Sequence, residues 1–90
     1  MESFYEQPTE RLDYDIDFTY WLPNGDAIIA TDAVSTPVGL ALTVTDYDTI
    51  IPKVWVAGGE DKNRYVVSVV CVTNQGRTKE VNFQIKVKDV

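Results

Sequence analysis

The sequence predicts an all-β protein that folds as a sandwich of six or seven antiparallel strands. Apolar and polar residues alternate with a period of two near both ends of the chain, which is typical of strands with one buried and one solvated face. Turn-forming residues recur about every 8–12 residues, as they do in β-sandwiches. We expect one sandwich domain over residues 11–90, preceded by a short extended N-terminal arm over residues 1–10.

The first expected strand covers residues 11–20. Its buried face carries Leu12, Tyr14, Ile16, Phe18 and Tyr20. Its solvated face carries Arg11, Asp13, Asp15, Asp17 and Thr19. Trp21 falls on the same face as the aspartates, and we expect it to cap the end of the core. Further strands are expected over residues 27–31, 39–45, 53–57 and 65–73, with turns between them rich in Gly, Pro, Asn and Asp.

The last strand is expected over residues 78–88 and should form a hairpin with residues 65–73. Asn74-Gln75-Gly76 separates the two segments, and Gly76 can supply the positive φ that a tight turn needs. Val81, Phe83, Ile85 and Val87 would then point inward. Tyr65 opens its strand directly after a Gly-rich loop, where immunoglobulin-like sandwiches place a tyrosine corner. These features favour an immunoglobulin-like β-sandwich.

The composition excludes several kinds of chemistry. The 90 residues include no histidine and one cysteine, so the chain cannot build a Ser-His-Asp or Cys-His site, a His/Cys zinc site or an internal disulfide. The formal net charge of −6 disfavours nucleic acid and anionic membranes as partners. We expect no cofactor and no catalytic residues, and the N-terminus lacks the pattern of a secretory signal.

The charge is divided unevenly along the chain. Residues 1–50 hold ten acidic residues and one basic residue, a sum of −9, whereas residues 51–90 hold four acidic and seven basic residues, a sum of +3. Such a bias is consistent with an ordinary solvated surface. It is also consistent with a module whose acidic face meets the basic face of a neighbour or of another copy.

The run Asp13-x-Asp15-x-Asp17 raises the question of a metal site. Calcium takes six to eight oxygen ligands that converge from several directions. Carboxylates on alternate residues of a strand lie about 7 Å apart and do not converge on one ion. We therefore interpret the run as a solvated strand face that discourages edge pairing, with no metal bound.

Four side chains of the expected strands and two of the arm are candidates for contact with other proteins. Val66, Val70 and Val72 break the alternation of their strand and point outward, either as ordinary surface valines or as a face covered by another subunit. Trp55 points outward if Val54 and Val56 point inward. Phe4 and Tyr5 lie in the arm, which either frays or docks on a partner through these aromatics. Cys71 is expected to be a small buried side chain.

Several motifs together resemble a protein family. They are Pro8-x-Glu10-x-Leu12-Asp13-Tyr14-x-Ile16-Asp17-Phe18, Trp55-x-x-Gly58-Gly59, Tyr65-x-Val67-x-Val69 and Gly76-Arg77-Thr78. From Pro8 onward the chain resembles the fiber-tail adaptor or tail-associated virion proteins of tailed bacteriophages, although Phe18 stands where members often have Trp. The resemblance implies an immunoglobulin-like, non-enzymatic structural protein of the virion, present in several copies and made in the host cytoplasm.

The resemblance implies other virion proteins as partners: tail, portal-proximal or fiber subunits that the chain would link. Two alternatives remain open from the sequence. One is a decoration or cement protein on the capsid, which hundreds of copies per particle would indicate, against roughly six or twelve around a tail axis. The other is an immunoglobulin-like module that recognises a host molecule through loops 58–63 and 23–26.

Overall fold

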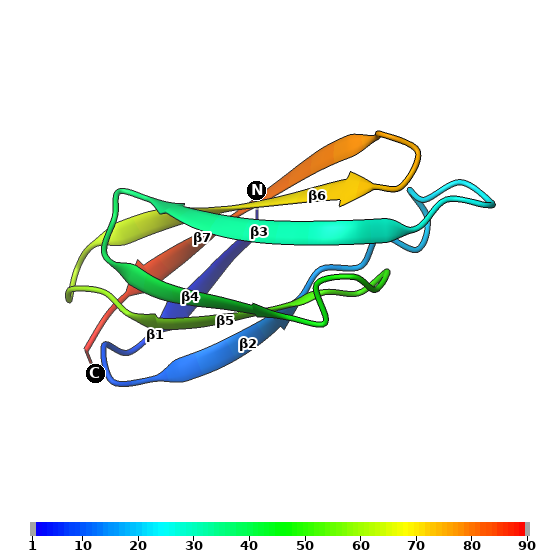
Figure 1. Ribbon diagram of the computed structural model, residues 1–90. Helices are drawn as coiled ribbons and strands as arrows, with labels where there is room; N and C mark the ends of the chain where they lie inside the picture. Colours follow the sequence, from blue (N-terminus) through cyan, green and yellow to red (C-terminus); the bar gives the residue numbers. More distant parts are fainter. Residues whose placement is uncertain (1, 90) are drawn as a thin grey trace.

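The computed structural model describes residues 2–89, which form seven strands in two facing sheets (Figure 1). The strands are β1 (Glu2–Glu6), β2 (Arg11–Asp15), β3 (Ile28–Thr36), β4 (Leu40–Thr45), β5 (Lys53–Gly58), β6 (Arg64–Thr73) and β7 (Thr78–Val87). The predicted all-β sandwich is confirmed, with seven strands. Among residues 2–89 no helix is long and apolar enough to cross a membrane.

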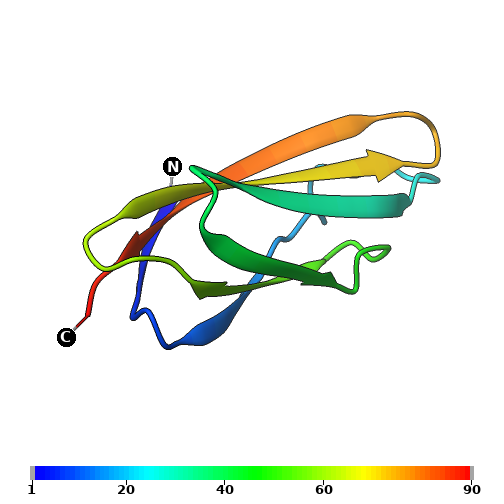
Figure 2. The same cartoon turned by 60° about the vertical axis from the view of Figure 1, so that its left-hand side comes forward.

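The two sheets differ in size, and the chain passes between them several times. One sheet has the order β1-β7-β6-β3 and the other β2-β5-β4, and both views show them stacked as two layers (Figures 1 and 2). The orders β7-β6-β3 and β2-β5-β4 parallel strands G-F-C and B-E-D of the immunoglobulin fold. The immunoglobulin-like assignment itself stays a prediction.

The N-terminal segment corrects two expectations. Residues 2–6 are not an arm without strand pairing but β1, which pairs with Phe83–Val87 at the edge of the larger sheet. This pairing is parallel, so the strands are not all antiparallel. The sequence gives little sign of β1, because five residues with one aromatic pair are too short for a clear alternation.

The core lies between the sheets and is built mainly by β5, β6 and β7. Their alternate side chains are almost fully buried, as the period-two pattern predicts. The central members are Val54, Val56, Tyr65, Val67, Val69, Cys71, Phe83, Ile85 and Val87. Cys71 is buried as predicted, and burial raises the pKa of its thiol. Leu40, Leu42 and Val44 of β4 pack against this core but stay half-buried because β4 is an edge strand.

The first predicted strand is shorter than its sequence pattern. It ends at Asp15, and Tyr20 is fully exposed rather than buried. The N–H groups of Ile16 and Phe18 still donate to the carbonyls of Pro52 and Ile50. The chain then turns, and the N–H groups of Trp21 and Leu22 both donate to the carbonyl of Phe18. This turn ends the alternation. It also packs Trp21 edge-on against Phe18, at the end of the core as predicted.

The boundaries of β3 also differ from the prediction. The strand begins and ends later than residues 27–31 and runs through the expected turn at Ser35 and Thr36. Its residues Thr31–Thr36 pair with Val66–Cys71, because the long apolar β6 supplies a partner for each of them. A bulge lies between Ile28 and Ala30.

The predicted hairpin between β6 and β7 is confirmed. Gly76 has φ +87°, and its N–H donates to the carbonyl of Thr73 at 3.0 Å. An ion pair connects the hairpin to the loop before β3: the Arg77 guanidinium lies 2.8 Å from the carboxylate of Asp26. The backbone N–H of Gln75 donates to the same carboxylate.

Tyr65 is confirmed as the predicted corner residue. Its hydroxyl oxygen accepts a hydrogen bond from the backbone N–H of Glu60 at 3.1 Å, which closes the loop between β5 and β6. A side chain at Gly39 would place its Cβ 2.8 Å from the Tyr65 ring, and Gly59 has a positive φ beside it. The two glycines therefore allow the backbone to pack directly against the ring.

Replacing Tyr65 by Phe should lower the free energy of unfolding by about 1 kcal/mol, because the Glu60 N–H loses its acceptor. Urea denaturation measures the change. Tyr20→Phe is the matched control: Tyr20 is 100% exposed, so its free energy of unfolding should shift by less than about 0.5 kcal/mol. Equal stability of Tyr65→Phe and the unmodified protein would contradict the corner role.

Candidate functional site

The outer face of the four-stranded sheet carries a stripe of valines. Val66, Val70 and Val72 point outward from β6 and are half-buried by their neighbours. Val34 of β3 lies opposite Ser68 on the same face and is 55% exposed. We call these four residues the outer valine stripe. It is narrow, because β7 presents Glu80, Asn82 and Gln84 beside it.

The two aromatic candidates of β1 point in opposite directions. Tyr5 lies opposite Lys86 on the outer face, is 67% exposed, and has the Lys86 ammonium 5.5 Å from its ring centroid. Phe4 points inward and packs on Tyr14 and Phe83, with ring centroids 4.9 Å and 5.9 Å away. Neighbouring residues of a strand face opposite sides, so Tyr5 is exposed on the outer face, whereas Phe4 is half-buried on the inner side.

Trp55 lies on the outer face of the three-stranded sheet, as predicted from its buried neighbours. Its ring is partly covered by the same chain: the Arg11 guanidinium lies 4.3 Å from the ring centroid. The ammonium of Lys53 lies between two carboxylates, 3.2 Å from Asp13 and 3.9 Å from Asp15. Trp55 is therefore far from the outer valine stripe, on the opposite face of the sandwich.

The three aspartates of the first predicted strand, Asp13, Asp15 and Asp17, do not converge. Asp13 and Asp15 contact Lys53, and Asp17 accepts a hydrogen bond from the backbone N–H of Thr19. Within residues 2–89 no group of three or more Asp, Glu, Cys or His side chains is arranged to hold a metal ion.

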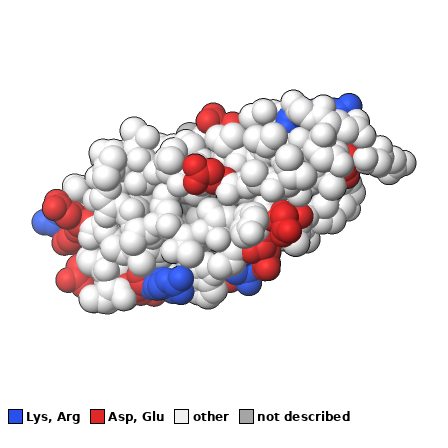
Figure 3. Space-filling model, viewed as in Figure 1, with Lys and Arg blue, Asp and Glu red and all other residues white. Residues whose placement is uncertain are grey.

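Some of the acidic residues in the first half of the chain form ion pairs with basic residues in the second half. Each ion pair among the described residues joins an acid of residues 1–50 to a base of residues 51–90. In the view of Figure 3, acidic and basic groups are interspersed rather than gathered into one patch of each sign. The sandwich places strands of both halves side by side, so the charge division of the sequence does not produce two opposed faces in this view.

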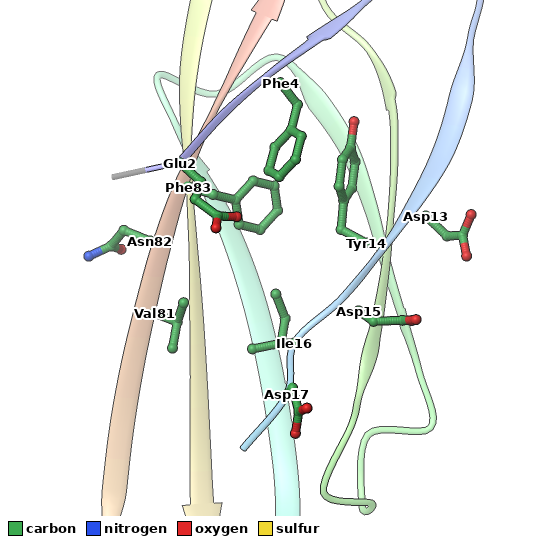
Figure 4. Close-up of a pocket in the computed structure, with 10 residues that line it drawn as sticks. All are labelled: Glu2, Phe4, Asp13, Tyr14, Asp15, Ile16, Asp17, Val81, Asn82 and Phe83. Atoms are coloured by element: carbon green, nitrogen blue, oxygen red, sulfur yellow. The ribbon is translucent and has the colours of Figure 1, made fainter. Parts of the chain in front are cut away.

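A groove of about 510 Å³ opens between β2 and the β1–β7 edge (Figure 4). Its floor is apolar and is formed by Phe4, Tyr14, Ile16, Val81 and Phe83. Acidic side chains border it: Glu2, Asp13, Asp15 and Asp17. The sequence does not predict this groove, because the groove depends on where β1 ends along β7.

A buried carboxyl lies where the chain passes from β1 to β2. Glu6 is 2% exposed, and its Oε2 accepts a hydrogen bond from the Tyr14 hydroxyl at 2.7 Å. Its Oε1 has no hydrogen-bond partner among residues 2–89. Burial raises the pKa of Glu6, the Tyr14 hydrogen bond opposes the rise, and Glu10 adds to it. Burial and the bond to Glu6 also raise the pKa of Tyr14. The spacing of Phe4 and Glu6 puts both side chains on one face of a strand, but the sequence does not show that this face is the inner one.

These features define a β-sandwich with an outer sheet face that carries valines, an outward tryptophan and an acidic-rimmed groove. Residues 6–86 match a family described as "Podophage GP4 fiber-tail adaptor protein gp77". The chain belongs to this phage fiber-tail adaptor family, as the resemblance implied. None of the curated proteins matches the chain.

A solved structure shares the fold. It is that of the 2,6-sialyltransferase of Vibrionaceae Photobacterium sp. JT-ISH-224, in a ternary complex with CMP and lactose. The similarity has a TM-score of 0.52 at 15% sequence identity. It covers 98% of this chain but only 18% of the enzyme chain, so the likeness concerns the fold of one part of that enzyme.

Replacing Glu6 by Gln should raise the stability of the protein at neutral pH. With its folded-state pKa raised, Glu6 stabilises the fold most when protonated, and that contribution is lost as pH rises through the folded-state value. The excess stability of Glu6→Gln should therefore be largest at neutral pH and shrink as the pH falls toward the ordinary range of a carboxyl. Thermal unfolding at a series of pH values measures it. A constant difference between the proteins at all pH values would contradict the burial of an ionisable Glu6.

Proposed function

We propose that the chain is a non-enzymatic structural subunit of a phage virion that links tail or head–tail junction components to tail fibers. The match of residues 6–86 to a fiber-tail adaptor family carries this proposal. The composition agrees with it, because a chain without histidine and with one buried cysteine lacks the usual nucleophilic and metal-binding machinery.

The outer face of the four-stranded sheet supports an assembly role. The outer valine stripe and Tyr5 lie on the same side of that sheet, which presents apolar and aromatic side chains to the outside. Apolar and aromatic groups at the centre of a contact, with polar groups around them, are typical of stable interfaces. Glu80, Asn82 and Gln84 would form the polar border. We propose that a neighbouring virion subunit covers this face.

The position in the particle tests the proposed function. Quantitative mass spectrometry of purified virions, together with separated heads and tails, gives both the copy number and the location of the chain. Roughly six or twelve copies that stay with the tail fraction are the expected result. Absence from purified particles would refute the proposal, and hundreds of copies on the heads would identify a capsid decoration protein instead.

Replacing Val70 by Glu should strongly reduce incorporation of the chain into virions, because it buries a charge at the proposed contact. A phage that lacks the gene, complemented with each variant, allows incorporation to be measured by mass spectrometry. Val38→Glu is the matched control, since Val38 is 93% exposed in a loop. Both variants should remain folded by circular dichroism. Equal incorporation of the two would show that the outer valine stripe is not an interface.

A further inference from the structure

The edge of β7 is only half covered by a neighbouring strand. β1 pairs with Phe83–Val87, and no described strand lies beside residues 78–82 on that side. The backbone bonds at the end of β7 show how its groups are directed: the N–H of Lys88 donates to Glu6 of β1, whereas the N–H of Val87 donates to Asn63 on the other side. Since these directions alternate along a strand, the N–H and C=O groups of Glu80 and Asn82 point to the uncovered edge.

The uncovered edge borders the apolar groove. Val81 and Asn82 line the groove together with Phe83 from β7. The opposite side is formed by Tyr14 of β2 and by Ile16, which directly follows β2. Figure 4 shows the rings of Phe4, Tyr14 and Phe83 gathered between the two walls. A segment that paired with the edge would therefore place every second side chain over an apolar floor.

The border of the groove is acidic. Glu2 and Asp17 form no ion pair with any described residue, and Lys53 is the one described cation paired with Asp13 and Asp15. Asp13 and Asp15 point away from the floor, toward the outer surface of β2 (Figure 4). Glu80 adds a further exposed carboxylate on β7 itself. This arrangement favours a partner with positive charge.

We propose that the groove binds an extended segment of another virion protein, which adds a strand to the larger sheet beside residues 78–82. The segment would alternate apolar side chains, which cover the floor, with Lys or Arg, which meet the carboxylates of Glu80, Glu2 and Asp17. Strand addition uses the main-chain groups of an edge for affinity and the side-chain pockets for specificity. The source of the segment, another virion protein, rests on the proposed function. The expected chemistry of the segment rests on the groove alone.

Two synthetic peptides test the groove on the isolated full-length chain: about eight residues of alternating Val and Lys, and the same length of alternating Val and Glu. Amide hydrogen exchange by nuclear magnetic resonance is measured with and without each peptide. The Val-Lys peptide should slow the exchange of the Glu80 and Asn82 amides, and its affinity should fall as salt is added. The Val-Glu peptide should have no such effect.

A pair of variants separates strand addition from simple charge attraction. Glu80→Pro removes the N–H that points to the uncovered edge, whereas Glu80→Ala removes the same charge and keeps the N–H. The ladder to β6 does not use this N–H, so both variants should fold, which thermal unfolding checks. Glu80→Pro should bind the Val-Lys peptide about tenfold more weakly than Glu80→Ala.

Asp17→Asn, which retains a side-chain oxygen for the Thr19 N–H, provides a second test if Glu80→Pro does not fold. It should weaken binding of the Val-Lys peptide. Three results would overturn the inference: equal binding of both peptides, equal binding of the Glu80→Pro and Glu80→Ala proteins, or peptide binding without protection of the Glu80 and Asn82 amides. Self-association of the chain that protects these amides would show a second copy as the occupant and would also overturn it. None of these results depends on where the chain lies in the virion.

Discussion

The parallel pairing of β1 with one half of β7 is the constraint on which the rest of this structure depends. It places residues 2–6 in the larger sheet, and the next residues must then carry the chain to the smaller sheet. A tight turn makes this passage, with the Glu10 N–H donating to the carbonyl of Gln7 and the Gln7 N–H donating to the Glu10 carboxylate. The aromatic rings of Phe4, Tyr14 and Phe83 join the two sheets beside the turn. This side of the sandwich is closed where β1 runs and open where it does not.

Strand β7 links the surfaces that this arrangement creates. Its inner side chains belong to the core, its outer side chains border the outer valine stripe, and its free backbone groups border the groove. A neighbour on the outer face and a strand in the groove would therefore contact the same strand from different directions. The proposed adaptor role requires contact with two kinds of neighbour, and β7 would carry both contacts.

Much of the fold follows from local pattern. Inward and outward side chains alternate along β6 and β7, their hairpin has a glycine with positive φ, and Tyr65 follows a Gly-rich loop. All three features were predictable because their causes lie close together in the sequence. The pairing of β1 joins residues about eighty positions apart, and no local signal encodes it. For the same reason the directions of Phe4 and Tyr5, and the groove beside them, were beyond residue-by-residue reading. Tyr20 was wrongly predicted to be buried, because the alternation of the sequence continues past the point where the chain turns.

Hydrogen exchange along β7 in the free chain tests most directly whether β1 covers only one half of that strand. The amide of Lys88, which donates to Glu6, should exchange slowly, whereas the amide of Glu80, which points to the uncovered edge, should exchange at close to the rate of an unprotected peptide. Slow exchange at both positions would mean that the edge is covered along its whole length. Fast exchange at both would mean that β1 is not paired with β7, and either result would contradict the account of the groove and its partner.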